Sequence, residues 1–342
     1  MVRLRENLLV GAVTWIVFSN LVCGPALGRD VKLVIRPQRI SAEADKYSLL
    51  PPPTSLTEGD AVPLYQKAVK ALPGRKNDEQ IQQWLKMPIE QLPADQVEQV
   101  LKAYVESLKC VAQAVKCWQC NWPAWTPGTH VPNNEEYRRL GLAIRLWARS
   151  EISQENCEGA VLAMQIGMGM GRHSTQVPTL AQFTMGVAIT AAMCKEMGEF
   201  MQVGEAPNLY AALAALPKPF TNVEKVIEDE KKVGASQASV GLGGREFENK
   251  TPFDGVRILA KHLEVDLAAL QCVEAIRSYA ASHGGQLPQT LAEITEVSVP
   301  KDPMSGAAFR YTRTGAGAML ESAAPAGGDA KDAVRYEITV KN

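Results

Sequence analysis

The sequence predicts a mainly α-helical fold that ends in a small α+β module. Apolar residues recur at intervals of three and four over much of positions 60–232 and again over 252–283, which is the spacing of one helical face. Near the C-terminus the pattern changes to alternating apolar and polar residues, which is typical of strands. We therefore expect an antiparallel, solenoid-like helical region, followed by one long helix and a short antiparallel sheet.

The first 28 residues have the pattern of a secretory signal peptide. Arg3 and Arg5 give a positive start, residues 8–22 are apolar, and Ala26-Leu27-Gly28 has the small residues of a cleavage site. We expect cleavage after Gly28 and export to the periplasm or the extracellular space. An uncleaved membrane anchor is the alternative.

Composition divides the remaining chain into four parts. Residues 29–59 are polar and end in three consecutive prolines, so we expect an extended linker there. The many small residues of 233–251 predict a flexible linker. These two linkers delimit a helical domain over 60–232 and an α+β module over 252–342.

Helix signals are clear in the first part of the helical domain. Asp60 is a suitable N-cap for a helix over 62–72, and a second short helix should contain Ile81 and Trp84. The longest regular spacing in this part runs from Ala94 to about Trp118 and predicts one helix.

Three further helices are expected over 134–150, 154–173 and 178–202. The short polar turns between them predict antiparallel neighbours. Residues 174–194 contain no Asp, Glu, Lys or Arg, but Pro178 and the glutamines would be costly in lipid. This stretch therefore predicts a buried central helix rather than a membrane span. The charged run 224–232 is interpreted as a solvated helix face.

The α+β module should begin with a helix over 252–283 that ends at Gly284-Gly285. A short helix over 290–294 follows. Strands are expected over 309–312, 319–322 and 334–340.

Part of this module resembles the globular part of type II secretion pseudopilins. The resemblance covers about residues 265–315. It rests on four short segments that occur in the same order and at the same spacing, and it implies a helix packed on a small sheet. Pseudopilins carry a prepilin cleavage site and a hydrophobic helix directly before this module, whereas a conventional signal and a long helical region precede it here. The resemblance thus implies a shared fold and not a pilus subunit. The four pieces are Ala275–Ala280, Gly285–Pro288, Val299–Pro303 and Phe309–Tyr311.

The middle of the chain resembles a broad group of exported bacterial proteins of unknown function that join a helical region to such a tail. The resemblance implies this architecture, and it implies no biochemical activity because none is known for the group. The matching pieces are Gly59–Tyr65, Cys120–Trp122, Gly171–His173, Pro178–Leu180 and Ala206–Leu213.

Charge and cysteine content exclude some function classes. The 36 Lys and Arg residues are balanced by 37 Asp and Glu residues, so no basic excess favours nucleic acid. Cys110, Cys117 and Cys120 form the most suggestive cluster, interpreted as a disulfide or buried thiols. Metal or thiol-redox chemistry is a weaker interpretation, because no second thiol or histidine pair follows at a ligand spacing.

No catalytic residue, metal ligand or cofactor is predicted. His130 and His173 belong to no metal-binding motif, and no nucleophile elbow is present. His173 lies near a predicted helix C-terminus, where we expect its cation to meet the helix dipole. The glycine run 167–171 lacks the third glycine of a dinucleotide loop, so helix packing explains it better.

We expect a non-enzymatic envelope scaffold or protein-binding module, with protein as the partner. Trp122 and Trp125 are the candidate interface anchors, and a role in capping the helical core is the equal alternative. A hydrolase or thiol-redox enzyme with a site around Cys117, Cys120 and His130 or His173 is one other hypothesis. An accessory of a pseudopilus-like secretion system is another.

Overall fold

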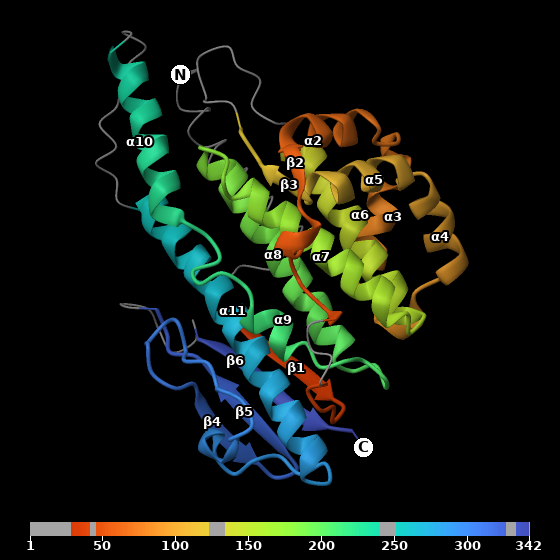
Figure 1. Cartoon of the computed structure of the whole chain (residues 1–342), viewed down its shortest axis with the longest axis vertical. Helices are drawn as coiled ribbons and strands as arrows, with labels where there is room; N and C mark the ends of the chain where they lie inside the picture. The colour runs from red at the N-terminus through yellow and green to blue at the C-terminus, as the bar shows by residue number, and fades with distance from the viewer. Residues whose placement is uncertain (1–28, 42–45, 123–133, 240–250, 326–332, 342) are drawn as a thin grey trace.

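The protein is mainly helical with a small mixed sheet at one end (Figure 1). The computed structural model describes residues 29–41, 46–122, 134–239, 251–325 and 333–341. The sheet and α11 lie at one end of the molecule, and α2 lies at the other. The expected signal peptide, residues 1–28, lies outside the described residues.

The helices have the following bounds. The first four are α2 (Ala61–Lys70), α3 (Asp78–Trp84), α4 (Ala94–Lys102) and α5 (Val105–Ala114). The next three are α6 (Asn134–Ser153), α7 (Cys157–Ser174) and α8 (Leu180–Phe200). The last three are α9 (Tyr210–Ala214), α10 (Val223–Ser239) and α11 (Thr251–Ser282).

The described residues also form six strands and several one-turn 3-10 helices, among them Leu291–Glu293 within the short helix expected over 290–294. A two-stranded parallel sheet joins β2 (Thr57–Asp60) to β3 (Cys117–Gln119). The four-stranded sheet has the order β1-β6-β5-β4. Its members are β1 (Arg29–Ile35), β4 (Arg310–Thr314), β5 (Gly317–Glu321) and β6 (Val334–Val340).

The centre of the helical region is formed by α6, α7 and α8, which all pack against one another. Their bounds confirm the three helices expected there to within a few residues. The uncharged stretch 174–194 is confirmed as a buried helix from Leu180 onward, because α8 is buried on nearly all sides, whereas residues 175–179 form the turn before it. Among the described residues, no helix combines the length and apolarity needed to cross a bilayer.

The close approach of α7 to α8 depends on two glycines of the crossing. A Cβ atom at Gly186 would lie 2.5 Å from the carbonyl oxygen of Gly171, closer than any such contact can be. The prediction that small residues of this region serve helix packing is therefore confirmed at this pair.

The single helix predicted over 94–118 is wrong. The chain turns at Ala103 and Tyr104 between α4 and α5, where the Tyr104 N–H donates to the carbonyl of Leu101, three residues earlier. The apolar spacing continues through this tight turn, so both helices still face the core. Beyond α5, residues 117–119 form β3 because they pair with β2.

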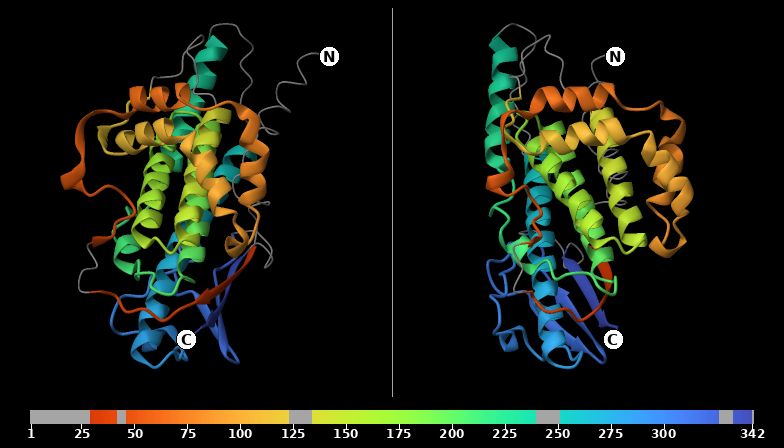
Figure 2. Two further views of the ribbon diagram at one scale, coloured as in Figure 1. Left: turned by 90° about the vertical axis from the view of Figure 1, so that its right-hand side faces the viewer. Right: turned by 45° about the vertical axis from the view of Figure 1, so that its right-hand side comes forward.

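The expected extended linker over 29–59 is also wrong in its first part. Residues 29–35 form β1, which lies parallel to β6 with Leu33 beside Ile338. The sheet is therefore mixed, and not antiparallel as predicted. Leu33 and Ile35 are buried, so this strand belongs to the core. The chain then runs along the helices to reach α2 at the opposite end (Figure 2).

The flexible linker predicted over 233–251 begins in regular structure. Helix α10 continues to Ser239, and α11 starts at Thr251. Residues 240–250 lie outside the described part of the chain. The small residues after position 233 do not stop a helix, because alanine, serine and glutamine are compatible with helical backbone.

The helical region and the C-terminal module share one hydrophobic core. Helix α11 packs on α8, α9 and β6, and is buried on several sides. Buried Arg277 binds both carboxylate oxygens of Glu274 at 2.8 and 2.9 Å. Arg277 also donates to the carbonyls of Arg36 and Ala206, which ties the segment after β1 and the segment before α9 to α11.

Candidate functional site

The carboxylate of Asp60 positions the segment that contains Cys120 and Trp122. As predicted, Asp60 caps α2, and its Oδ1 accepts from the Val62 N–H at 3.1 Å. The same oxygen accepts from the Asn121 N–H at 3.0 Å. The half-buried carboxylate of Asp60 thus fixes both the start of α2 and the chain that follows β3.

Trp122 covers one end of the helical core. Its ring stacks on Tyr65 with centroids 5.8 Å apart and an interplanar angle of 15°, and it meets Tyr137 edge-on. Its Nε1–H donates to the carbonyl of His173 at 2.9 Å. The ring is only half-buried, so it closes the core and also lines a cleft beside it. Its proposed companion Trp125 lies outside the described residues.

His173 is held as a neutral base in this cluster. The Tyr65 hydroxyl lies 2.9 Å from its Nδ1. Burial lowers the pKa of His173 to about 4, the neighbouring Arg172 adds to the effect, and Asp60 opposes it. The expectation of a histidine cation at the end of α7 is therefore wrong. Burial also raises the pKa of Tyr65 and of Tyr137.

The thiols near this cluster are not activated. Cys110, Cys117 and Cys120 are free thiols. Burial raises the pKa of Cys117 and, far more strongly, that of Cys120, and the negative charge of Asp60 adds to both. A nucleophilic or metal-binding thiol needs the opposite shift.

The structure places only part of the predicted enzyme site together. Cys117 and Cys120 lie near each other, and Tyr65 links Cys120 to His173. His130 lies outside the described residues. Within the described ranges, no three His, Cys, Asp or Glu side chains converge in a way that could hold a metal ion.

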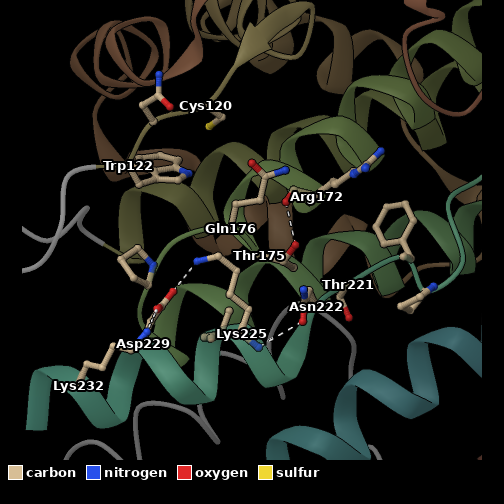
Figure 3. Close-up of a pocket in the computed structure, with 15 residues that line it drawn as sticks. Cys120, Trp122, Arg172, Thr175, Gln176, Thr221, Asn222, Lys225, Asp229 and Lys232 are labelled. Carbon is tan, nitrogen blue, oxygen red and sulfur yellow. Dashed lines mark hydrogen bonds and ion pairs between the residues drawn. The ribbon is translucent and has the colours of Figure 1, made fainter.

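A cleft with a volume of about 1010 Å³ lies beside this cluster, between α7 and α10 (Figure 3). We call it the α7–α10 cleft. One wall consists of Cys120, Trp122 and the end of α7, and the other wall is α10 with the loop before it. Figure 3 shows Arg172 and Thr221 toward one end, and Trp122, Asp229 and Lys232 toward the other.

The α10 wall is one face of a helix. Asn222, Lys225, Val226, Asp229 and Lys232 are spaced by three and four residues, and all line the cleft. Asp229 accepts from Lys225 at 2.6 Å and lies 3.7 Å from Lys232. The run interpreted as a solvated face thus also forms one wall of the α7–α10 cleft, a role that its charges alone do not reveal.

The α7 wall contributes polar groups of a different kind. Thr175 is buried, and its hydroxyl donates to the carbonyl of Arg172 at 2.8 Å. Gln176 is exposed, and Arg172 is half-buried. Burial lowers the pKa of Arg172, and no carboxylate of the described residues pairs with its guanidinium.

Sequence reasoning missed Arg172 and the α10 wall. In the sequence, Arg172 is distinguished only as the basic residue between Gly171 and His173. The spacing of apolar and charged residues does not indicate that α10 would face it. Comparison of the chain with protein-family models, with curated proteins and with solved structures finds no match.

Proposed function

We propose that this chain is an exported, non-enzymatic protein that binds a segment of a partner polypeptide in the α7–α10 cleft. The observation that carries the proposal is the cleft itself, which is open, about 1010 Å³ in volume and lined by both apolar and polar groups. Ligand sites of roughly 300–1,000 Å³ hold whole drug-sized molecules, so several residues of an extended peptide would fit.

The lining supports a peptide as the ligand. Trp122 and Pro178 are half-buried and offer apolar surface of the kind that anchors side chains. Gln176 and Asn222 bring amide groups, which can donate to and accept from a peptide backbone. This pairing of rigid apolar surface with adaptable polar groups is common at protein interfaces.

The chemistry of the neighbouring groups favours binding over catalysis. The raised pKa values of Cys117 and Cys120 leave little thiolate at neutral pH. The Nδ1 atom of His173 is engaged by Tyr65, and its carbonyl by Trp122. These residues support a core-capping role, and for that reason we place the function in the cleft.

Two finer predictions belong to the same proposal. We propose that the helices stack in a solenoid-like manner and that the C-terminal module, with its resemblance to pseudopilins, serves as a stabilising or docking unit. A role as an accessory of a pseudopilus-like secretion system stays a prediction. It requires co-purification with secretion components, and repeated absence of those components would remove it.

Selection of peptides on the purified protein tests the proposed function. A displayed library of random peptides is selected on the protein, and the affinity of individual peptides is measured by fluorescence polarisation. Gln176→Trp should abolish binding by filling the cleft, because Gln176 is exposed on the cleft wall. Gln96→Trp is the matched control, since Gln96 is exposed on α4, far from the cleft.

The outcomes of this selection are distinct. Peptides that bind the protein and Gln96→Trp but not Gln176→Trp support a cleft that binds peptides. Peptides that bind all three proteins equally, or no enrichment at all, would overturn the proposal.

A further inference from the structure

Arg172 differs from the buried arginines of this protein. Each buried arginine in the described part of the chain binds a carboxylate, which offsets the cost of removing its charge from water. Arg172 is half-buried, yet no carboxylate of the described residues lies within ion-pair distance, and its guanidinium makes no hydrogen bond with those residues. Among the buried pairs, Arg145 and Arg149 bind Glu196, Arg277 binds Glu274, and Arg139 binds Asp78.

The other charges of the cleft do not supply the missing anion. Asp229 is the carboxylate of the described lining, and it is already engaged by Lys225 at 2.6 Å. Lys232 pairs with Glu228 at 2.8 Å and lies 3.7 Å from Asp229, so neither carboxylate is free for Arg172. Asp229 and Glu228 thus balance the two lysines, and Arg172 is the cation of the described lining that is left without a carboxylate. The whole chain has a net charge of −1, so this uncompensated positive charge is a local property of the cleft.

We propose that the α7–α10 cleft binds an acidic peptide segment, with one carboxylate of the peptide held by the guanidinium of Arg172. This inference rests on the proposed function and names the class of partner. A carboxylate matches the paired N–H donors of a guanidinium, and a charge-assisted bond in a partly desolvated cleft is stronger than one in open water. Lys232 is exposed toward the other end of the cleft and can contact a second acidic residue in addition to Glu228.

The apolar part of the lining favours a peptide over a small free acid. Trp122 lies toward the end of the cleft opposite Arg172 (Figure 3), so a ligand that reaches both must be extended. A small dicarboxylate would contact the arginine and leave the tryptophan unused. A peptide with an acidic residue and an apolar residue a few positions away uses both ends of the cleft.

Paired synthetic peptides test this inference. For each peptide selected on the protein, a second peptide is made in which every Asp and Glu is replaced by Asn and Gln. The acidic peptide should bind about 10- to 100-fold more tightly than its neutral counterpart. Arg172→Gln should lose the same factor with the acidic peptide and almost nothing with the neutral one, so that the two changes are not additive. Arg39→Gln, at an exposed arginine outside the cleft, should change neither affinity.

Two further variant measurements and one competitor separate a role in binding from a loss of folding. Arg172→Lys should recover part of the affinity, because it restores the charge without the paired geometry. Unfolding of Arg172→Gln by urea checks that the variant folds, and we expect stability at least equal to that of the wild type, because an uncompensated charge is removed. Succinate is the competitor that represents a small free acid.

Each outcome bears on the inference. Equal affinity for the acidic and neutral peptides, or acidic preference that Arg172→Gln does not reduce, would overturn it. Displacement of the acidic peptide by millimolar succinate would identify a small carboxylate as the ligand and would also overturn it. If Gln176→Trp still abolishes binding of neutral peptides, the proposed function survives while this inference fails.

Discussion

The Tyr65 hydroxyl and Nδ1 of His173 lie 2.9 Å apart, and this contact joins α2 to the end of α7. Trp122 stacks on the tyrosine and donates to the histidine carbonyl, so three segments that are far apart in sequence meet in one cluster. The cluster closes the core of the helical region and forms the edge of the α7–α10 cleft. Its integrity should therefore depend on a neutral His173.

The first prediction concerns the pH dependence of stability. The pKa of His173 is about 4 in the folded protein against 6.5 when unperturbed, so only the unfolded chain binds a proton between these values. The stabilisation is complete above pH 6.5 and is lost as the pH falls toward 4, by up to about 3 kcal/mol. Urea unfolding of the wild type and of His173→Gln, measured from pH 8 to pH 4, isolates this contribution.

The wild type should lose more stability than His173→Gln over that pH range, because all other groups titrate alike in both proteins. His283→Gln serves as the control, since His283 is exposed at the end of α11. Parallel pH profiles for the wild type and His173→Gln would contradict the neutral state of His173.

The second prediction concerns the buried charge cluster of α6 and α8. Glu196 is fully buried and accepts from Arg145 at 2.7 Å and from Arg149 at 3.2 Å. Glu196→Gln removes the carboxylate that these two buried guanidinium groups share and should lower the free energy of unfolding by about 3–5 kcal/mol. The exposed pair of Glu98 and Lys102 provides the control, because Glu98→Gln should leave that free energy nearly unchanged.

The third prediction tests whether β1 is part of the core. Ile35 is fully buried and Val34 is 38% exposed on the same strand. Ile35→Ala should destabilise the protein by about 2–5 kcal/mol, whereas Val34→Ala should have a much smaller effect. Both values come from urea unfolding. Equal, small effects at the two positions would mean that residues 29–35 are a linker after all.

The fourth prediction concerns thiol reactivity. Because burial raises the pKa of Cys117 and of Cys120, both thiols should react slowly with a chromogenic disulfide reagent at pH 7. Unfolding in urea should restore the rate of an ordinary cysteine. Mass spectrometry of the labelled peptides identifies each site. Rapid labelling of Cys117 or Cys120 in the folded protein would revive the thiol-redox hypothesis.

Local pattern was sufficient to predict most helices but not every break between them. The helices α6, α7 and α8 have long apolar spacing and short turns, and both signals are local. The turn at Ala103 and Tyr104 has no glycine or proline, and the apolar spacing passes through it unchanged. Such a turn is decided by the packing of α4 and α5, which the local sequence does not contain.

Long-range contacts explain the remaining misses. Val31, Leu33 and Ile35 do alternate with other residues, which is a strand signal, but their partner is the last strand of the chain. The α7–α10 cleft is lined by residues near positions 120, 172 and 222. Because these segments are far apart in sequence, no local motif predicts the cleft. Three of the buried arginines had a signal in the sequence, because Arg138, Arg145 and Arg149 share one face of α6.

Hydrogen–deuterium exchange with a bound acidic peptide tests the central claim most directly. The peptide selected on the protein is added at saturation, and amide exchange is compared with that of the free protein. We predict slower exchange in residues 172–178 and 219–232, the two walls of the cleft, and little change in β4, β5 and β6. Protection confined to the sheet, or none in the cleft walls, would contradict the assignment of the α7–α10 cleft as the binding site.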